Sequence, residues 1–345
     1  MKTLKKNNRC VKCILSSSFP KIKFDKNGVC NFCRDKMFFV AEDSAISKAK
    51  GRIEKLIQSS KGNSEYDAIM CYSGGKDSTY TLKIAVEKYG LKILSFTLDN
   101  GFISQTAFEN INKVVDSLGV DQITIRPSVK FFRSVIKASA LNEVYRPQTL
   151  ARISSGCNSC ISLVNITALK LAIEKETPFI IAGFTLGQIP SNAMFYRNNY
   201  KFFQESREPV LKKLRKYVGD IVDDYYCVRD SLLNRVKSYP YNINLLCIEN
   251  ISEDEIVKQI EPLGWTRPSD VDGCSSNCRL NIFNNYIHQK TFGYSPYELE
   301  LSHLIRKGQL TRKEALYKIN DQPENQLKGI MDELGISENA ILKIK

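Results

Sequence analysis

The chain has 345 residues and a mass of 39.2 kDa, enough for roughly two domains, and its 43% hydrophobic residues can fill real cores. Charged residues make up an ordinary 25%, which excludes a chain that is disordered by composition. The net charge of +13 and the pI near 9.1 favour anionic partners such as nucleotides, RNA or an acidic carrier, and they indicate nothing about the fold.

The N-terminus predicts no export. Its first nine residues are basic and run directly into Cys10, without the apolar core of a secretory signal. The longest apolar runs, such as residues 179–182, are far shorter than the roughly 20 residues that span a bilayer. We therefore expect a cytoplasmic protein with no membrane partner. In that reducing compartment, eleven cysteines indicate metal or sulfur chemistry rather than disulfides.

The first two cysteine pairs predict a zinc ribbon at residues 1–40. Their spacing, C-x2-C-x16-C-x2-C, suits two thiolate knuckles that close on one tetrahedral Zn²⁺ ion. An Asn-Gly turn at 27–28 predicts a short hairpin before the second knuckle. Four unliganded thiols and an iron-sulfur cluster are the alternatives. The predicted zinc ligands are Cys10, Cys13, Cys30 and Cys33.

A charged helical connector at 41–62 leads to the main domain, which we expect at 63–250. The apolar run at 66–72 suits a buried parallel strand, and a helix-periodic stretch begins at Thr79. The glycine-rich loop between them suits an anion, because glycines let a phosphate approach closely, a helix start offers N–H groups and a lysine adds charge. The loop reads Ser73, Gly74, Gly75, Lys76, Asp77, Ser78.

The spacing of this loop excludes two common phosphate motifs. A Walker A loop needs glycine six residues before the lysine, where this chain has Met70, and a Rossmann fingerprint does not have adjacent glycines. The string S-G-G-K-D-S instead resembles the PP-loop of the N-type ATP pyrophosphatases, also called adenine nucleotide alpha hydrolases. The resemblance implies that ATP is cleaved between its α and β phosphates and that AMP is transferred to a carbonyl oxygen. It assigns nucleotide binding to Ser73, Gly74, Gly75, Lys76, Asp77 and Ser78, with Lys76 and Asp77 also catalytic.

Further strands are predicted at 91–98, 122–125 and 178–183, separated by helical stretches such as 105–118. This alternation predicts an α/β fold with a doubly wound, mainly parallel sheet of the PP-loop, HUP-like type. Ligands bind at the carboxyl ends of the strands in such sheets, where Asp99 follows the second strand. Asp99 is therefore a candidate nucleotide or Mg²⁺ ligand, with a plain turn or capping aspartate as the alternative.

Two later cysteine pairs suggest a second metal site. Cys157 and Cys160 precede a predicted helix at 161–173, whose dipole is expected to lower thiol pKa values and favour ligands or nucleophiles. A dithiol packed under the sheet is the alternative. Cys274 and Cys278 lie in a turn-rich loop that can supply one or both remaining ligands, Cys278 preferred and Cys274 next. The alternative there is an ordinary loop with two thiols.

The remaining segments carry weaker signals. Basic and aromatic residues alternate between 186 and 240, as in a base-stacking surface or, as we favour, a solvated helical face with its aromatics turned inward. We expect a cysteine loop and a helical region at 251–345, with a capping box at Thr311 and a helix end at Gly335. The two histidines, His288 and His303, are assigned no role.

Both ends of the chain resemble a narrower group. The segments K-F-D-K-N-G-V-C-N-F-C, G-Y-S-P-Y-E-L and L-I-R-K-G-Q-L-T-R-K-E-A-L are similar to those of PP-loop proteins grouped with the N-acetyl sugar amidotransferases of surface-glycan synthesis. Cys157 and Cys160 depart from that group's pattern, and the chain shows no glutaminase signature. A cysteine pair after the PP-loop is similar instead to the thiolating branch, in which three cysteines hold a 4Fe-4S cluster.

The leading hypothesis is ATP-dependent adenylation of a carbonyl followed by sulfur insertion, with ATP, Mg²⁺, Zn²⁺ and a 4Fe-4S cluster as cofactors. Cys157 and Cys160 would then serve catalysis as well as metal binding. The acceptor would be a small molecule, a nucleotide or a tRNA. Sulfide or a sulfur donor protein would be the partner that supplies sulfur. A homodimer is compatible with the sequence. The first alternative is amidation with ammonia from a partner glutaminase. The second is a zinc-ribbon nucleic-acid-binding regulator that only senses nucleotide.

Overall fold

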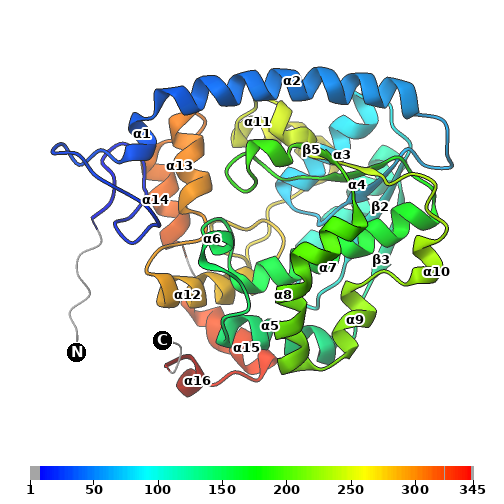
Figure 1. Ribbon diagram of the computed structural model, residues 1–345. Helices are drawn as coiled ribbons and strands as arrows, with labels where there is room; N and C mark the ends of the chain where they lie inside the picture. The colour runs from blue at the N-terminus through cyan, green and yellow to red at the C-terminus, as the bar shows by residue number, and fades with distance from the viewer. Residues whose placement is uncertain (1–7, 322, 343–345) are drawn as a thin grey trace.

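The computed structural model describes residues 8–321 and 323–342. The basic residues 1–7 discussed above lie outside this range. A six-stranded sheet in the order β3-β2-β1-β4-β6-β5 forms the centre of the molecule (Figure 1). Its strands are β1 Ala68–Cys71, β2 Ile93–Leu98, β3 Asp121–Ile125, β4 Phe179–Ala182, β5 Phe195–Arg197 and β6 Tyr241–Ile243.

All strand pairs in this sheet are parallel except the pair at one edge, where β5 runs antiparallel to β6. The central strands are in register, because Ala68 of β1 lies opposite Ile93 of β2 and Phe179 of β4. Their carboxyl ends therefore meet at one edge of the sheet, where the glycine loop begins. The α/β class and the mainly parallel sheet are as predicted, whereas β5 and β6 were not predicted. Each has three residues; β5 lies in the basic and aromatic stretch, and β6 reads Tyr-Asn-Ile.

Helices cover both faces of the sheet. In β1, Ile69 packs into one hydrophobic cluster, whereas Ala68 and Met70 pack into the other, as the alternation of side chains along a strand requires. The first cluster includes residues of α5 Val129–Leu141, α7 Ser155–Glu174, α8 Tyr200–Val218, α9 Ile221–Tyr226, α12 Leu280–Phe292 and α15 Glu324–Leu334. The second includes residues of α2 Lys36–Ser60, α3 Lys76–Glu87, α4 Gln105–Leu118 and α11 Glu253–Ile260.

Local sequence signals match these elements closely in places. Helix α4 has the bounds predicted for it, whereas α3 begins at Lys76, three residues before the predicted start at Thr79, with Gly75 as its N-cap. Helix α7 begins at Ser155, six residues before the predicted start, so Cys157 lies in its first turn. The predicted connector is the long helix α2, which Figure 1 shows running across the top of the molecule; its Ile53 and Ile57 are buried, so α2 belongs to the packed domain.

The N-terminal module comprises residues 8–35 and includes α1 Asn31–Arg34. Phe24 and Cys30 form an antiparallel bridge across a turn in which Gly28 has a φ of +74°, so the predicted hairpin is present. The module packs against Tyr294 and lies beside α13 Glu298–Arg306 and α14 Arg312–Asn320 (Figure 1). The two ends of the sequence therefore meet in the fold.

The C-terminal region is helical, as predicted, and it packs on the sheet domain. Thr311 and Glu314 form the predicted capping box, and Gly335 ends α15 in a left-handed conformation. Helix α12 contacts α7, and α15 contacts α5. The remaining short elements are α6 Pro147–Leu150, α10 Asp230–Leu233, α16 Glu338–Leu342, η1 Ser191–Ala193, η2 Leu245–Ile248 and η3 Glu261–Leu263.

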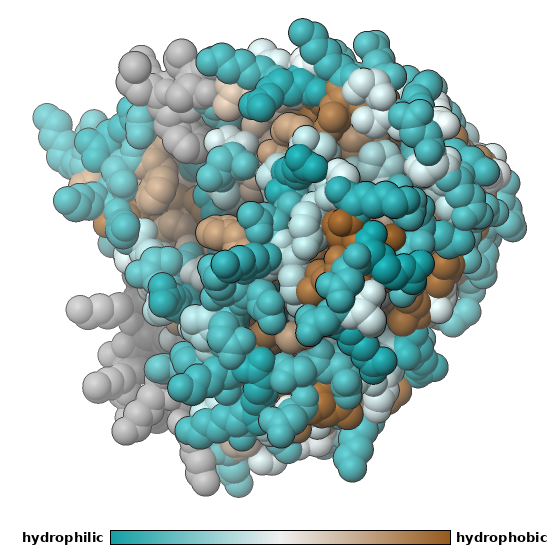
Figure 2. Space-filling view, turned by 45° about the vertical axis from the view of Figure 1, so that its right-hand side comes forward, coloured by the Kyte–Doolittle hydropathy of each residue, from teal (hydrophilic) through white to brown (hydrophobic). Residues whose placement is uncertain are grey.

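The described surface resembles that of an ordinary globular α/β protein. Figure 2 shows a mainly hydrophilic face on which hydrophobic residues form small, separate patches. Within the described residues, α7 is the one helix whose length and apolar composition would allow it to cross a membrane. It contacts α5, β1, α9 and α12, so its apolar residues belong to the protein core.

Candidate functional site

The predicted phosphate loop connects β1 to α3, and its backbone is closely packed. Gly74 has a φ of +72°, and a Cβ there would lie 2.4 Å from the Ala107 carbonyl oxygen, so this position requires glycine. The Trp265 indole N–H donates to the Gly74 carbonyl oxygen at 3.0 Å. A Cβ at Gly183 would lie 2.8 Å from Ser78 Cα, which places the turn after β4 directly on the loop.

The two loop serines brace the turn from inside. Ser78 Oγ lies 3.0 Å from Ser73 Oγ, and the Gly75 N–H donates to Ser73 Oγ at 3.4 Å. Ser78 Oγ also donates to the Gly75 carbonyl oxygen at 3.0 Å. These contacts fix the turn at the start of α3, where the positive end of the helix dipole favours an anion.

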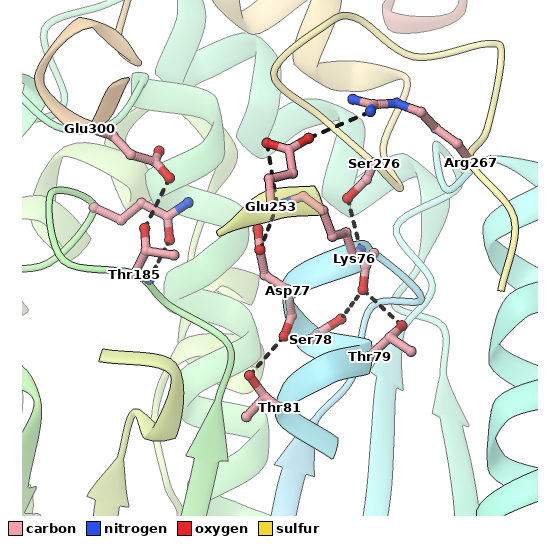
Figure 3. A network of polar contacts seen from close by, with 12 residues as sticks. Lys76, Asp77, Ser78, Thr79, Thr81, Thr185, Glu253, Arg267, Ser276 and Glu300 are labelled. Carbon is pink, nitrogen blue, oxygen red and sulfur yellow. Dashed lines mark hydrogen bonds and ion pairs between the residues drawn. The ribbon is translucent and has the colours of Figure 1, made fainter. Parts of the chain in front are cut away.

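Lys76 and Asp77 lie at the mouth of this loop, within a charged network (Figure 3). Lys76 Nζ is 2.6 Å from the Asp77 carboxylate and 3.8 Å from Glu253. Burial by itself would lower the pKa of Lys76, but the Asp77 and Glu253 carboxylates outweigh burial and raise it. The backbone N–H of Lys76 donates to Ser276 Oγ at 3.0 Å. The carboxylates thus keep Lys76 Nζ cationic, while the backbone N–H of Lys76 is bonded to a hydroxyl oxygen.

Two cavities flank the loop and share Asp77 as a lining residue. One, of about 490 Å³, is charged, and we call it the charged cavity. It is lined by Lys76, Asp77, Glu253, Arg267, Glu300 and Lys318, among others. The second, of about 290 Å³, is the cysteine cavity. Its lining includes Ser73, Gly75 and Ser78 of the loop, apolar side chains such as Phe96 and Leu98, and five cysteines, Cys71, Cys157, Cys160, Cys274 and Cys278.

The structure brings Cys157, Cys160 and Cys278 together at the cysteine cavity. The Asn100 amide nitrogen lies 3.7 Å from both Cys160 Sγ and Cys278 Sγ. Asn284 Nδ2 lies 3.1 Å from Cys157 Sγ. The loop that carries Cys278 is fixed beside Asn100 by a bridge between Ile103 and Cys278. Thiols that are about 120 residues apart in sequence therefore face one cavity with the phosphate loop.

Cys274 lies apart from these three thiols. Its Sγ donates to the Lys318 carbonyl oxygen at 3.5 Å, and its side chain packs with a separate small cluster that includes Leu301. It lines both cavities without sharing Asn100. The placement therefore favours Cys278 over Cys274 as the third member of the group.

The expectation that the helix start lowers the thiol pKa values is wrong for this structure. Burial raises the pKa of Cys157 to about 12, despite hydrogen bonds from Ser154 and Asn284 that lower it. Burial likewise raises the pKa of Cys160 and Cys278. The loss of hydration outweighs the helix dipole here. Without a metal these thiols stay protonated, whereas a coordinated metal would deprotonate them.

Asp99 occupies a turn, and its neighbour Asn100 is the residue that lines the cysteine cavity. Asp99 accepts from the Gly101 N–H at 2.9 Å and lies 3.4 Å from the Arg126 guanidinium, as a turn residue does. The lining of the cysteine cavity includes Asn100, which contacts the thiols. A ligand role for Asp99 remains a prediction, and Asn100 is a site residue that the sequence analysis missed.

The four N-terminal cysteines form a compact group whose Sγ atoms all lie within 4.8 Å of one another. Two of these separations are 3.9 Å, Cys10 to Cys33, and 3.7 Å, Cys13 to Cys30. Tetrahedral zinc with Zn–S bonds of about 2.3 Å places its sulfurs about 3.8 Å apart. Hydrogen bonds from Cys30 and Cys33 lower the pKa of Cys13, which favours a thiolate. The four residues therefore fit one metal ion.

Three of the cysteines that line the cysteine cavity, Cys157, Cys160 and Cys278, fit a different metal group. Each thiolate ligand of a 4Fe-4S cluster binds a separate iron, so the ligands are spaced more widely than those of one ion. Three thiols around one cavity, with Asn100 and Asn284 amides directed at the sulfurs, provide that donor set. They would leave one iron without a protein ligand.

Several residues of the charged cavity carried no sequence signal. Glu253, Arg267, Glu300 and Lys318 lie far from the phosphate loop in sequence and belong to no motif of their own. Thr185 Oγ1 donates to the Glu300 carboxylate at 2.9 Å, and burial raises the pKa of Glu300 to about 7. Only Trp265, the single tryptophan of the chain, marked this part of the sequence as unusual.

Comparisons with known proteins find a match to a family model, a relative by sequence and a similar solved structure. Residues 269–344 match the family model described as "LPS biosynthesis protein WbpG-like, C-terminal domain". An uncharacterized protein of Methanocaldococcus jannaschii is 23% identical over 312 residues, covering 89% of this chain and 91% of that protein. Among solved structures, the U34-tRNA thiolase NcsA from Methanococcus maripaludis, with its 4Fe-4S cluster, aligns over 87% of this chain and 86% of that chain, with 17% identity and a TM-score of 0.37. A TM-score this low carries no argument about function.

Proposed function

We propose that this chain is an ATP-dependent enzyme that activates a carbonyl group as its adenylate and then replaces the oxygen with sulfur. The observation that carries the proposal is the convergence of Cys157, Cys160 and Cys278 on the cavity that the phosphate loop also lines. Adenylation alone would need the loop and a metal ion. Three thiols beside it are what a sulfur-transfer reaction needs in addition.

In the first step, the acceptor's carbonyl oxygen attacks the α-phosphorus of ATP, and the bond to the β-phosphate breaks. The glycine loop and Lys76 would hold the pyrophosphate that leaves, because backbone N–H groups and a lysine stabilise the charge that develops there. Asp77, the acidic residue next to Lys76, would hold Mg²⁺ against the phosphates. Zn²⁺ in the N-terminal module would serve the structure alone.

In the second step, a sulfide anion adds to the activated carbon, AMP leaves with the original oxygen, and the sulfur loses its proton to become C=S. AMP is needed because oxide is a poor leaving group. Cys157, Cys160 and Cys278 would hold a 4Fe-4S cluster, which supplies iron with an open coordination position for sulfur delivery. The chain's own residues bind the acceptor next to the loop and exclude water from the activated carbonyl.

The direct test uses the full chain purified without oxygen. With ATP, sulfide and candidate acceptors (free nucleotides, tRNA, amides and acetamido sugars), we expect iron-dependent formation of AMP and an acceptor in which sulfur replaces one oxygen, detected by mass spectrometry. Lys76→Ala should abolish AMP formation and leave the fold intact, since Lys76 is the first residue of α3 and Glu253 keeps Arg267 and Lys318 as partners. Lys83→Ala, which removes a lysine farther along α3, is the matched control. Undiminished AMP formation by Lys76→Ala would end the adenylation proposal.

Amidation is the second candidate, and the WbpG-like match at residues 269–344 favours it. In this reaction ammonia from a partner glutaminase adds to the same adenylate, and the acceptor belongs to lipopolysaccharide biosynthesis. The two candidates share the first step and differ in the nucleophile. Protein that is colourless after anaerobic reconstitution and consumes ATP with ammonia would favour amidation. Brown, iron-containing protein that requires sulfide would favour thiolation.

A further inference from the structure

Three cations from distant parts of the chain gather around one carboxylate in the charged cavity. Glu253 lies 3.8 Å from Lys76 Nζ, 2.9 Å from Lys318 Nζ and 3.5 Å from Arg267 Nη1. Figure 3 shows Glu253 between Arg267 and the start of α3. The Lys76 and Lys318 side chains are 13% and 15% exposed, so their mutual repulsion is only weakly screened by solvent. Glu253 keeps these cations together when no other anion is present.

From this arrangement we infer that Arg267 and Lys318 bind the β- and γ-phosphates of ATP, and the pyrophosphate formed from them, together with Lys76. The inference rests on the proposed adenylation and adds ligands from the C-terminal region to the loop's own. A polyphosphate entering the charged cavity would take over the cations that Glu253 now holds. A chain of two phosphates carries enough charge to engage all three, whereas AMP has a single phosphate.

Two further contacts support this position for the phosphate chain. Ser276 Oγ, an oxygen, already accepts the backbone N–H of Lys76 and lines both cavities, so it marks an oxygen site at the start of α3. The backbone at Lys318 packs closely against Gly273, because a Cβ at Gly273 would lie 2.8 Å from the Lys318 carbonyl oxygen. Helix α14 is thus packed against the loop that carries Ser276.

The two cavities would then separate the products of adenylation. Pyrophosphate would occupy the charged cavity, and the α-phosphate and the activated carbonyl would face the cysteine cavity, with Asp77 between them. The leaving group would therefore have its own cavity, which Cys157, Cys160 and Cys278 do not line. This division explains why both cavities border the same loop.

The test measures binding of inorganic pyrophosphate, ATP and AMP, each with Mg²⁺, to the full-length protein by calorimetry. Trp265 is the single tryptophan of the chain and is hydrogen-bonded to Gly74, so its fluorescence gives a second signal. Lys318→Met and Arg267→Met should each weaken pyrophosphate and ATP binding about tenfold or more, since each removes a charge-assisted contact. AMP binding should change less than twofold, and Lys318→Arg should restore most of the loss.

Lys313→Met, which removes an exposed lysine on the same helix, is the control and should bind pyrophosphate as the unmodified chain does. If Lys76→Met loses pyrophosphate binding and both Lys318→Met and Arg267→Met keep it within twofold, this inference is overturned and the loop proposal stands. If Lys76→Met also keeps it, the phosphate role of the loop itself is wrong. Equal losses for AMP and pyrophosphate in Lys318→Met would indicate a structural role only and would also overturn the inference.

Discussion

The N-terminal cysteines face one another, whereas Cys157, Cys160 and Cys278 face a cavity. In the first group all four sulfurs lie within 4.8 Å of one another, and three of the four residues are buried. In the second group two sulfurs share one amide, Asn100, and all three border the space beside the phosphate loop. A closed set of four ligands suits structure, and an open set of three suits chemistry.

Helix α13 connects the N-terminal module to the charged cavity. Glu298 accepts from Arg9 at 2.7 Å and from the Ser16 N–H at 2.8 Å, both in the N-terminal module. Glu300, two residues later, lines the charged cavity and accepts from Thr185. The metal module is thus fixed to the helix that also carries a residue of the site. The comparison predicts that changes on the module side affect folding and that changes on the cavity side affect cofactor content and pH response.

The largest expected effect follows from removing one ligand of the four-cysteine group in the N-terminal module. Cys13→Ser should remove zinc and cost roughly 5 kcal/mol or more of folding free energy in the module, because binding free energy of structural zinc is largely folding free energy. Metal analysis and thermal unfolding of the full chain measure both. Cys227→Ser, which removes a thiol outside both groups, should keep its zinc. Full stability in a zinc-free Cys13→Ser protein would contradict a structural role.

Iron content should distinguish the predicted cluster ligands, Cys157, Cys160 and Cys278, from Cys274. We expect Cys278→Ala, like Cys157→Ala and Cys160→Ala, to lose nearly all iron after anaerobic reconstitution, because two thiolates cannot hold the cluster. Cys274→Ala should retain it, since Cys274 contacts Lys318 instead of Asn100. Iron analysis and visible absorption measure the effect. Loss of iron in Cys274→Ala alone would show that the third ligand is misassigned.

The ion pair between Arg9 of the N-terminal module and Glu298 of α13 should contribute moderately to the unfolding free energy. Glu298 is fully buried and forms an ion pair with Arg9, so Glu298→Gln leaves that arginine without its charge partner. We expect a loss of roughly 3 kcal/mol in unfolding free energy. Chemical denaturation of the zinc-loaded chain is the measurement, with the exposed Glu205→Gln as control. If Glu298→Gln is as stable as the control, the ion pair adds no stability beyond the packing around Tyr294.

The smallest effect concerns the cavity side of α13. Burial raises the pKa of Glu300 from 4.5 to about 7, so its protonated form favours the folded state. That contribution is complete below the unfolded pKa and is lost as the pH rises through about 7. The unfolding free energy of the unmodified chain should therefore fall as the pH rises from 5 to 8. In Glu300→Gln this fall should be smaller by roughly 2 kcal/mol. If the unfolding free energies of Glu300→Gln and the unmodified chain depend on pH in the same way, this prediction is wrong.

The sequence by itself determined what depends on neighbouring residues. The strand, glycine loop and helix around Gly74 follow one another directly, so their pattern was readable. The bounds of α4 and the capping box at Thr311 were likewise set within a few residues of chain. The spacing of the N-terminal cysteines was sufficient because a short hairpin closes the group.

Only the tertiary structure decided which distant residues meet at the loop. Cys278, not Cys274, lies beside Asn100, because the bridge to Ile103 sets the course of that loop. Glu253 and Lys318 reach the phosphate loop through the packing of α11 and α14, which no local pattern encodes. Burial is also a property of the whole fold, and for this reason the thiol pKa values rise where the helix start alone predicted a fall.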